Sequence, residues 1–270
     1  MFSFNRSGRA WSVFLLILLF IGACRQFPGG PTAGNPDPAA IITPDNNSGV
    51  DNSVDGSADK STGAYPSKVS VLPGESLDFH ISNGYGAKYT LSIYREGATP
   101  TLMGTIPNVS TINYSCTGGY DKGCNWPVGA TFTVPKDWPS GIYTVYIPRQ
   151  GGGNPMKTMF FVRAPKPTAR ILFLSSVNTF HAYNDFGGGS LYGFGDTVKS
   201  QKVSFNRPYA NGTGLYDRWE SHFVTWSAAA GYKMDYAATY DLEFQPQLLN
   251  GYDLVIIAGH SEYWTWDMRQ

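Results

Sequence analysis

Leu254-Val-Ile-Ile-Ala-Gly-His-Ser-Glu-Tyr-Trp264 is the stretch that decides the fold of this chain. Its first five residues form a short apolar run that predicts a fully buried strand. Gly259 ends the run, and His260 and Glu262 follow directly. Because open α/β sheets bind ligands outside the carboxyl ends of their strands, the stretch places an acid–base side chain and a carboxylate where such folds carry their chemistry.

Earlier segments of the C-terminal part extend this pattern. Residues 171–175 and 232–236 predict two further strands, and residues 245–251 predict a short helix or turn. Four apolar residues recur at helical spacing and predict an amphipathic helix that is capped by Gly231: Trp219, Phe223, Trp226 and Ala230. This alternation indicates a partial doubly wound α/β domain of the glutamine-amidotransferase or flavodoxin type over residues 168–270, with a parallel sheet.

Residues 66–165 follow a different pattern, in which short alternating segments are separated by turn signals such as Pro73-Gly74 and Asn83-Gly84. No helical periodicity interrupts them. Six segments fit period two: Val69–Leu72, Leu77–Ile81, Tyr89–Tyr94, Ala130–Val134, Ile142–Ile147 and Met159–Arg163. The pattern predicts an immunoglobulin-like β-sandwich, joined to the α/β domain by a stiff proline-containing linker.

The first 65 residues are typical of an exported and tethered protein. Arg6 and Arg9 precede an apolar run that is too short to span a bilayer as a settled helix. Ile21-Gly-Ala-Cys24 is similar to the lipobox of bacterial lipoproteins. We therefore expect residues 1–24 to be a signal peptide and Cys24 to be lipidated, which anchors the mature chain to a bacterial membrane, in the outer membrane or periplasm or at the cell surface. An ordinary secretory signal is the alternative. Residues 25–65 predict a disordered tether because they contain few large apolar side chains.

Composition and cysteine spacing narrow the function further. Twenty basic and twenty acidic side chains cancel, so there is no electrostatic basis for nucleic-acid binding. Export permits disulfides, and we expect Cys116 and Cys124 to pair across the turn-forming loop that they bracket. A metal site at these cysteines is the weaker alternative, because no His or third Cys lies nearby.

A glycine-rich segment follows the first strand of the α/β part. We expect residues 177–193 to form a loop, in which three successive glycines, 187–189, let the backbone approach a ligand closely. The segment lacks a Walker lysine and the order G-x-G-x-x-G, which disfavours a phosphate-binding loop and leaves a plain structural loop as the alternative. The chain has no G-x-S-x-G and no free Cys in this part, which excludes a serine elbow and a cysteine triad.

Four linked segments carry a family resemblance: Trp138–Tyr143, Asn178–Tyr192, Val203–Tyr209 and Gly259–Trp264. In order and spacing they resemble the large (beta) subunit of N,N-dimethylformamidase and the wider group that shares its C-terminal domain, over roughly residues 127–270. The resemblance implies a hydrolase of small amides with one iron ion, bound by two tyrosines and one glutamate. It leaves open a homo-oligomer and a separate small subunit.

Carried over residue by residue, the resemblance implies Tyr143, Tyr183 and Glu262 as ligands of Fe³⁺, and His260 with Glu262 as catalytic residues. Phenolate and carboxylate are hard oxygen donors that suit a ferric ion. The ligand set predicts a site between the sandwich and the α/β part. Further residues of the family pattern, an Asn and a Lys, would lie beyond Gln270, so an inactive or truncated member is an alternative expectation. A non-catalytic surface lipoprotein that binds a glycan or a protein partner is a second alternative, from a different class.

Overall fold

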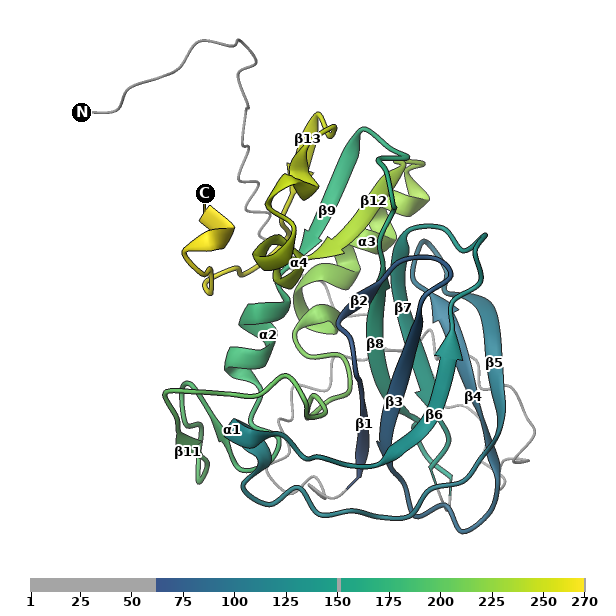
Figure 1. Ribbon diagram of the computed structural model, residues 1–270, viewed down its shortest axis with the longest axis vertical. Helices are drawn as coiled ribbons and strands as arrows, with labels where there is room; N and C mark the ends of the chain where they lie inside the picture. Colours follow the sequence, from purple (N-terminus) through teal and green to yellow (C-terminus); the bar gives the residue numbers. More distant parts are fainter. Residues whose placement is uncertain (1–61, 150–151, 270) are drawn as a thin grey trace, which may run out of the picture.

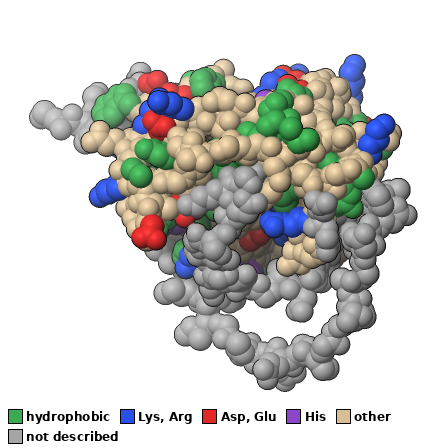
Figure 2. Space-filling view, turned by 90° about the horizontal axis from the view of Figure 1, so that it is seen from below, with side chains coloured by type: hydrophobic (Ala, Val, Ile, Leu, Met, Phe, Trp, Pro, Cys, Tyr) green, Lys and Arg blue, Asp and Glu red, His purple; other side chains and the backbone are tan. Residues whose placement is uncertain are grey.

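The computed structural model describes residues 62–149 and 152–269, and it combines a two-sheet β region with a smaller unit of mixed strands and helices (Figure 1). The predicted signal peptide, Cys24 and residues 25–61 of the predicted tether lie outside the described residues. None of the helices in the described part of the chain combines the length and the apolar content that a membrane span requires. Charged side chains of both signs lie scattered over the face shown in Figure 2.

The β region consists of two facing sheets. The first is antiparallel, with the strand order β1 (Gly63–Pro66), β3 (Ser76–Ser82), β6 (Val128–Thr133). The second has the order β2 (Ser70–Val71), β8 (Met156–Val162), β7 (Gly141–Ile147), β4 (Tyr89–Arg95), β5 (Thr101–Val109), in which only the β2–β8 pair is parallel. All six predicted strand segments are therefore present.

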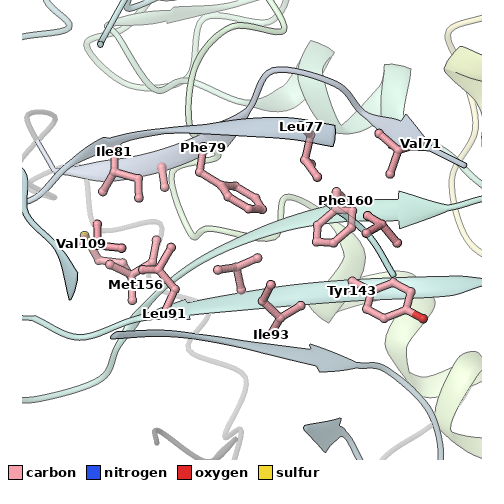
Figure 3. Packing of buried hydrophobic residues seen from close by; sticks show 14 of the residues in the cluster. Val71, Leu77, Phe79, Ile81, Leu91, Ile93, Val109, Tyr143, Met156 and Phe160 are labelled. Carbon is pink, nitrogen blue, oxygen red and sulfur yellow. The ribbon is translucent and has the colours of Figure 1, made fainter. Parts of the chain in front are cut away.

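Alternating apolar side chains from the two sheets form the main core (Figure 3). On β3, Leu77, Phe79 and Ile81 point inward and are buried, whereas the residues between them are only partly buried. Phe79 meets Phe160 of β8 edge-to-face, with ring centroids 5.8 Å apart. Each such side chain stabilises the fold by about 1.5–3 kcal/mol relative to exposure, which explains why period two is strong in this region.

Two strands of the β region were not predicted from the sequence. Strand β1 begins at Gly63, and Ala64 and Tyr65 are buried. Residues 63–65 therefore belong to the sandwich, and the tether predicted over residues 25–65 extends three residues too far. Strand β5 contains Gly104 and Pro107. It is an edge strand that pairs only with β4, the position where a sheet tolerates proline.

The second unit is built on a parallel three-stranded sheet. Strand β9 (Ile171–Ser175) lies between β12 (Met234–Ala238) and β13 (Leu254–Ile256), and all three run in the same direction. One face of this sheet packs against apolar side chains of the sandwich, including Met159 and Phe161. The other face packs against residues of the C-terminal segments. The carboxyl ends of the three strands consequently share one edge.

Helices surround this sheet. They are α2 (Val177–Tyr183), the π-helical turn η1 (Tyr216–Glu220), α3 (Ser221–Ala229), α4 (Thr239–Phe244) and the 3₁₀ turns η2 (Pro246–Leu249) and η3 (Asp267–Arg269). The prediction that residues 177–193 form a loop is wrong for residues 177–183, which are helical. Residues 189–190 and 198–199 form the short parallel pair β10 and β11, and α1 (Gly119–Lys122) lies between the two cysteines.

The predicted apolar stripe of the helix before Gly231 is wrong. Trp219 and Trp226 are exposed, whereas four residues on another face are buried: Tyr216, Glu220, Val224 and Ser227. The prediction from hydrophobic periodicity was wrong because the buried face includes a carboxylate, and a search for apolar residues does not count it. The predicted cap is present, since Gly231 has φ +81° directly after the helix and its N–H donates to the carbonyl of Ala228.

Candidate functional site

Four polar side chains converge beyond the carboxyl ends of β9 and β13. Tyr183 ends helix α2, and its hydroxyl lies 3.3 Å from Nε2 of His260. The same Nε2 lies 2.7 Å from Oε1 of Glu262. The hydroxyl of Tyr192 donates a hydrogen bond to Oε2 of Glu262, and its ring lies 4.2 Å from that of Tyr183. Tyr183, Tyr192, His260 and Glu262 are called the converging group below.

A third tyrosine orders the converging group. The hydroxyl of Tyr263 donates to that of Tyr192 at 2.9 Å, and Tyr192 in turn donates to Glu262. Because Tyr192 accepts the proton of Tyr263, its own hydroxyl proton is directed toward Glu262. The hydrogen bond from Tyr192 is the main reason that the pKa of Glu262 lies below its ordinary value, and the bond from His260 acts in the same direction. Partial burial is the largest cause that raises the pKa of Tyr192, and its hydrogen bond to Glu262 adds to it.

The loop that carries His260 and Glu262 is held by its backbone. Gly259 has φ +79°, and a Cβ at this position would lie 2.8 Å from Cβ of Trp219, so glycine is required there. Three residues later, the hydroxyl oxygen of Thr179 accepts the N–H of Glu262 at 2.9 Å. Because Thr179 is a buried residue of α2, this bond ties the loop to the helix that ends in Tyr183.

The start of α2 is fixed by a buried carboxylate. Glu220 accepts hydrogen bonds from Oγ of Ser175 at 2.6 Å and from the backbone N–H of Ser176 at 2.8 Å. Burial raises the pKa of Glu220 to about 8, although both hydrogen bonds act in the opposite direction. Glu220 therefore connects η1 to the point where β9 passes into α2.

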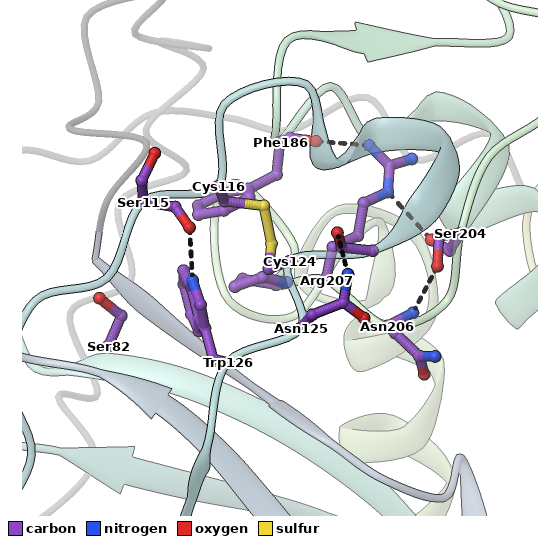
Figure 4. Close-up of a disulfide and its surroundings, with 12 residues drawn as sticks. Ser82, Ser115, Cys116, Cys124, Asn125, Trp126, Phe186, Ser204, Asn206 and Arg207 are labelled. Carbon is purple, nitrogen blue, oxygen red and sulfur yellow. Dashed lines mark hydrogen bonds between the residues drawn. A yellow bond between two sulfur atoms is a disulfide. The ribbon is translucent and has the colours of Figure 1, made fainter.

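Tyr192 reaches the converging group through the three-glycine turn. Gly187 and Gly188 have φ +85° and +98°, a conformation that other residues rarely adopt. A Cβ on Gly187 would lie 2.8 Å from the backbone nitrogen of Tyr120, so the turn packs directly on the loop between the cysteines. In that loop Cys116 and Cys124 form a disulfide with Cα atoms 4.7 Å apart, the pairing expected from the sequence (Figure 4).

Arg207 reinforces the same turn from inside. Its guanidinium is buried and donates to the carbonyls of Phe186, which precedes the glycines, and Gly189, the last of them, at 2.6 and 3.0 Å. It also donates to the carbonyls of His181 and Ser204, each at 3.0 Å. Figure 4 shows this side chain beside the disulfide. One cation thus joins α2, the glycine turn and residues 204–207.

Tyr143 is not part of the converging group. It is a fully buried residue of β7, stacked between Trp138 and Phe160 at centroid distances of 4.8 and 5.5 Å. Its hydroxyl donates to the carbonyl of Pro139 at 2.8 Å, and burial raises its pKa. Of the three tyrosine and glutamate ligands expected from the sequence, the structure brings together only Tyr183 and Glu262.

Tyr192 is the second phenol at this edge, whereas Tyr143 lies in the sandwich core. Within residues 62–149 and 152–269, no cluster of three or more His, Cys, Asp or Glu side chains is arranged to hold a metal, so a metal at this edge would need tyrosine ligands. Two phenol oxygens and one carboxylate, with Tyr192 bonded directly to Glu262 and Tyr183 linked to it through His260, make a set of hard donors that fits a trivalent ion. The side chains of His260 and Glu262 are 43% and 37% exposed, so ligands can reach the group from solvent.

The sequence matches the family model described as "N,N-dimethylformamidase beta subunit-like, C-terminal" over residues 90–270. The chain belongs to this family. The matched region begins within β4, so the dimethylformamidase-like unit includes much of the sandwich and extends further toward the N-terminus than the linked motifs indicated. All four residues of the converging group lie inside it.

Two relatives were compared directly. The N,N-dimethylformamidase beta subunit of Paracoccus aminophilus is 28% identical over 188 aligned residues, and that of Alcaligenes sp. is 27% identical over the same length. Each alignment covers 53% of this chain and 24% of the relative. The chain therefore spans about a quarter of the length of these curated relatives.

Three contributors to the site were missed in the sequence: Thr179, Tyr192 and Tyr263. A signal existed for Tyr192, since it ends the family-like segment Asn178–Tyr192 and follows the glycines that turn the chain back. Tyr263 directly follows Glu262, but its contact with Tyr192 depends on tertiary packing. Thr179 carried no signal, because its role arises only once residues 177–183 are helical.

Proposed function

We propose that this chain is a dimethylformamidase-like hydrolase subunit that acts on the C–N bond of a small amide at the converging group. The observation that carries the proposal is the meeting of Tyr183, Tyr192, His260 and Glu262 at the carboxyl ends of β9 and β13, within the region that defines the family. Both relatives are N,N-dimethylformamidase beta subunits, and this suggests the substrate class.

We further propose that Tyr183, Tyr192 and Glu262 hold Fe³⁺, with Tyr192 in the position that the sequence assigned to Tyr143. Such an ion, when bound, polarises an amide carbonyl and lowers the pKa of a bound water. Tyr183 and Tyr192 would hold such a cation as phenolates, and the hydrogen bonds of Tyr192 with Glu262 and Tyr263 fix its hydroxyl beside the carboxylate.

His260 is proposed to exchange the proton of the reaction. Its Nε2 lies 3.3 Å from the hydroxyl of Tyr183 and 2.7 Å from Oε1 of Glu262. A histidine held in this way can donate a proton to the amine that leaves when the C–N bond breaks. Phe194 and Trp219 lie beside Tyr192 and His260, at centroid distances of 5.5 and 6.5 Å, and offer apolar surfaces for small alkyl substituents.

The finer architecture and location belong to the same proposal. The facing orders β1-β3-β6 and β2-β8-β7-β4-β5 support an immunoglobulin-like sandwich, and the parallel order β12-β9-β13 supports part of a flavodoxin-like or glutamine-amidotransferase-like sheet. We also propose that the chain is exported and anchored through a lipid on Cys24, which places the amidase site at a bacterial membrane surface.

The test is iron binding with matched tyrosine variants. Full-length protein loaded with Fe³⁺ should bind about one ion per chain and show a visible phenolate-to-iron absorption band. Tyr183→Phe and Tyr192→Phe should each weaken or abolish the band, while Tyr232→Phe, at an exposed position after α3, should leave it unchanged. Loss of the band in Tyr143→Phe but not in Tyr192→Phe would reject the assignment in favour of the buried tyrosine.

Activity is measured separately, as release of dimethylamine from N,N-dimethylformamide. His260→Ala should lower kcat strongly and leave iron content near that of the unmodified protein, because His260 is not one of the proposed ligands. If His260→Ala instead retained full activity, its role as proton carrier would be wrong.

A further inference from the structure

A second cavity lies on the other side of α2. It has a volume of about 240 Å³ and lies between β2 and β8 of the sandwich and helices α2 and α4. His181 of α2, two residues before Tyr183, lines it together with Arg163, Arg207 and Asp241. None of these four side chains takes part in the hydrogen bonds of the converging group.

A row of mutually tilted aromatic rings forms one wall of the cavity. Phe244 lies at the mouth and is 64% exposed, and its ring centroid is 5.1 Å from that of Tyr240. Tyr240 lies 5.2 Å from Phe205, and Phe205 lies 4.0 Å from His181. This row of rings leads from solvent to a buried imidazole, and it provides flat faces on which a planar ligand can pack.

His181 has an unpaired polar atom. The residue is 4% exposed, and its Nε2 lies 2.8 Å from the hydroxyl of Tyr209. Its Nδ1 is buried and has no hydrogen-bond partner among the described residues. No other acceptor is recorded for the Tyr209 hydroxyl within that part of the chain, so we assign it as the donor to Nε2, which leaves the ring proton on Nδ1. Buried donors in proteins are nearly always paired, and this one therefore points to a ligand that accepts.

The charges around the cavity favour an anion. Arg163 is paired with Asp241, with Nε 3.1 Å from Oδ1, and donates from Nη1 to Gln245 at 2.7 Å. Arg207 is 1% exposed and donates its hydrogen bonds only to carbonyl oxygens; the carboxylate of Asp185 acts on it electrostatically but is not in an ion pair with it. Arg207 is therefore a buried cation without a directly paired carboxylate, and buried charges are normally compensated.

We propose that this cavity binds a small planar carboxylate, of the class of an aromatic acid. Its carboxylate accepts the proton of His181 Nδ1 within the positive field of Arg207 and Arg163. Its ring packs along Phe205, Tyr240 and Phe244. The ligand is distinct from the amide proposed for the converging group, which is uncharged and smaller.

Benzoate is the probe, titrated calorimetrically into the full-length protein, with benzyl alcohol as a neutral planar control. One benzoate should bind per chain, and benzyl alcohol should bind at least tenfold more weakly. His181→Phe should weaken benzoate binding at least tenfold, whereas His222→Phe, at an exposed position of α3, should not change it. Phe244→Ala also weakens binding, and because Phe244 is exposed this variant tests the cavity even if His181→Phe does not fold.

Three results would overturn the proposal. The first is no saturable benzoate binding at millimolar concentration. The second is binding that is undiminished in both His181→Phe and Phe244→Ala. The third is a crystal structure of the benzoate-soaked protein in which ordered water alone pairs with Nδ1 of His181.

Discussion

Replacing Glu220 with glutamine should remove a pH-dependent loss of stability. The carboxyl of Glu220 has a pKa of about 8 in the folded protein against an ordinary value of 4.5. A raised pKa means that the folded state binds the proton more tightly than the unfolded state. Stability is therefore greatest below pH 4.5 and falls as the pH rises toward 8, after which the group adds no further loss.

The size of the effect follows from these two values. One pKa unit corresponds to about 1.4 kcal/mol, so ionising Glu220 costs the folded state on the order of 5 kcal/mol in total. Between pH 6 and pH 9 the loss from this group is about 3 kcal/mol, because part of the change has already occurred below pH 6 and part of the carboxyl titrates near pH 8. Glutamine resembles the protonated acid: its oxygen can accept from Ser176 and its amide can donate to Ser175.

Urea unfolding followed by tryptophan fluorescence measures the effect at pH 6 and pH 9. Glu220→Gln should exceed the stability of the unmodified protein by about 2 kcal/mol at pH 6 and by about 5 kcal/mol at pH 9, so that the difference between the two proteins grows by about 3 kcal/mol over this range. Glu75→Gln removes an exposed carboxylate, which accepts only the N–H of Leu72, and should follow the pH dependence of the unmodified protein. Parallel loss of stability in Glu220→Gln and the unmodified protein would refute the reasoning.

Three other perturbations test separate parts of the structure. Thr179→Ala removes the acceptor for the backbone of Glu262 and should weaken Fe³⁺ binding about five- to tenfold in a chelator competition, as one hydrogen bond contributes about 1 kcal/mol, while Thr179→Ser should restore it. Replacing Cys116 and Cys124 together by alanine should lower the free energy of unfolding by about 2–3 kcal/mol in urea, and an unchanged midpoint would show that the loop is fixed without the bond. Cys24→Ser should abolish incorporation of labelled fatty acid and release the protein from the membrane fraction, whereas continued labelling would contradict the lipobox assignment.

The sandwich was largely predictable because one face of each strand is buried. The period-two pattern of apolar residues identified β3, β4 and β7 with small boundary errors, because alternate residues of these strands contact the same core. The pattern failed at β1 and β5, which lie at the margins of their sheets. There, pairing with a neighbouring strand outweighs the local signals of glycine and proline, and that pairing is not visible along the sequence.

The candidate site was only partly predictable because its geometry depends on a turn and a helix that lack strong patterns. Tyr183 and Glu262 were found through linked motifs, and the structure places them within one hydrogen-bonded network. Tyr143 was assigned by motif alone, and its environment is instead a stack of core rings. Tyr192 was overlooked because only the glycine turn after α2 reverses the chain and returns it to Glu262.

The contact between the disulfide loop and the glycine turn links the site to the redox state of its surroundings. Disulfides form in oxidising compartments and are reduced in the cytosol. Where the two thiols are free, the loop that supports Gly187 loses its covalent closure, and with it the firm placement of the arm that ends in Tyr192. In the exported, iron-binding protein proposed above, oxidation of this loop would therefore precede binding of the metal by the converging group.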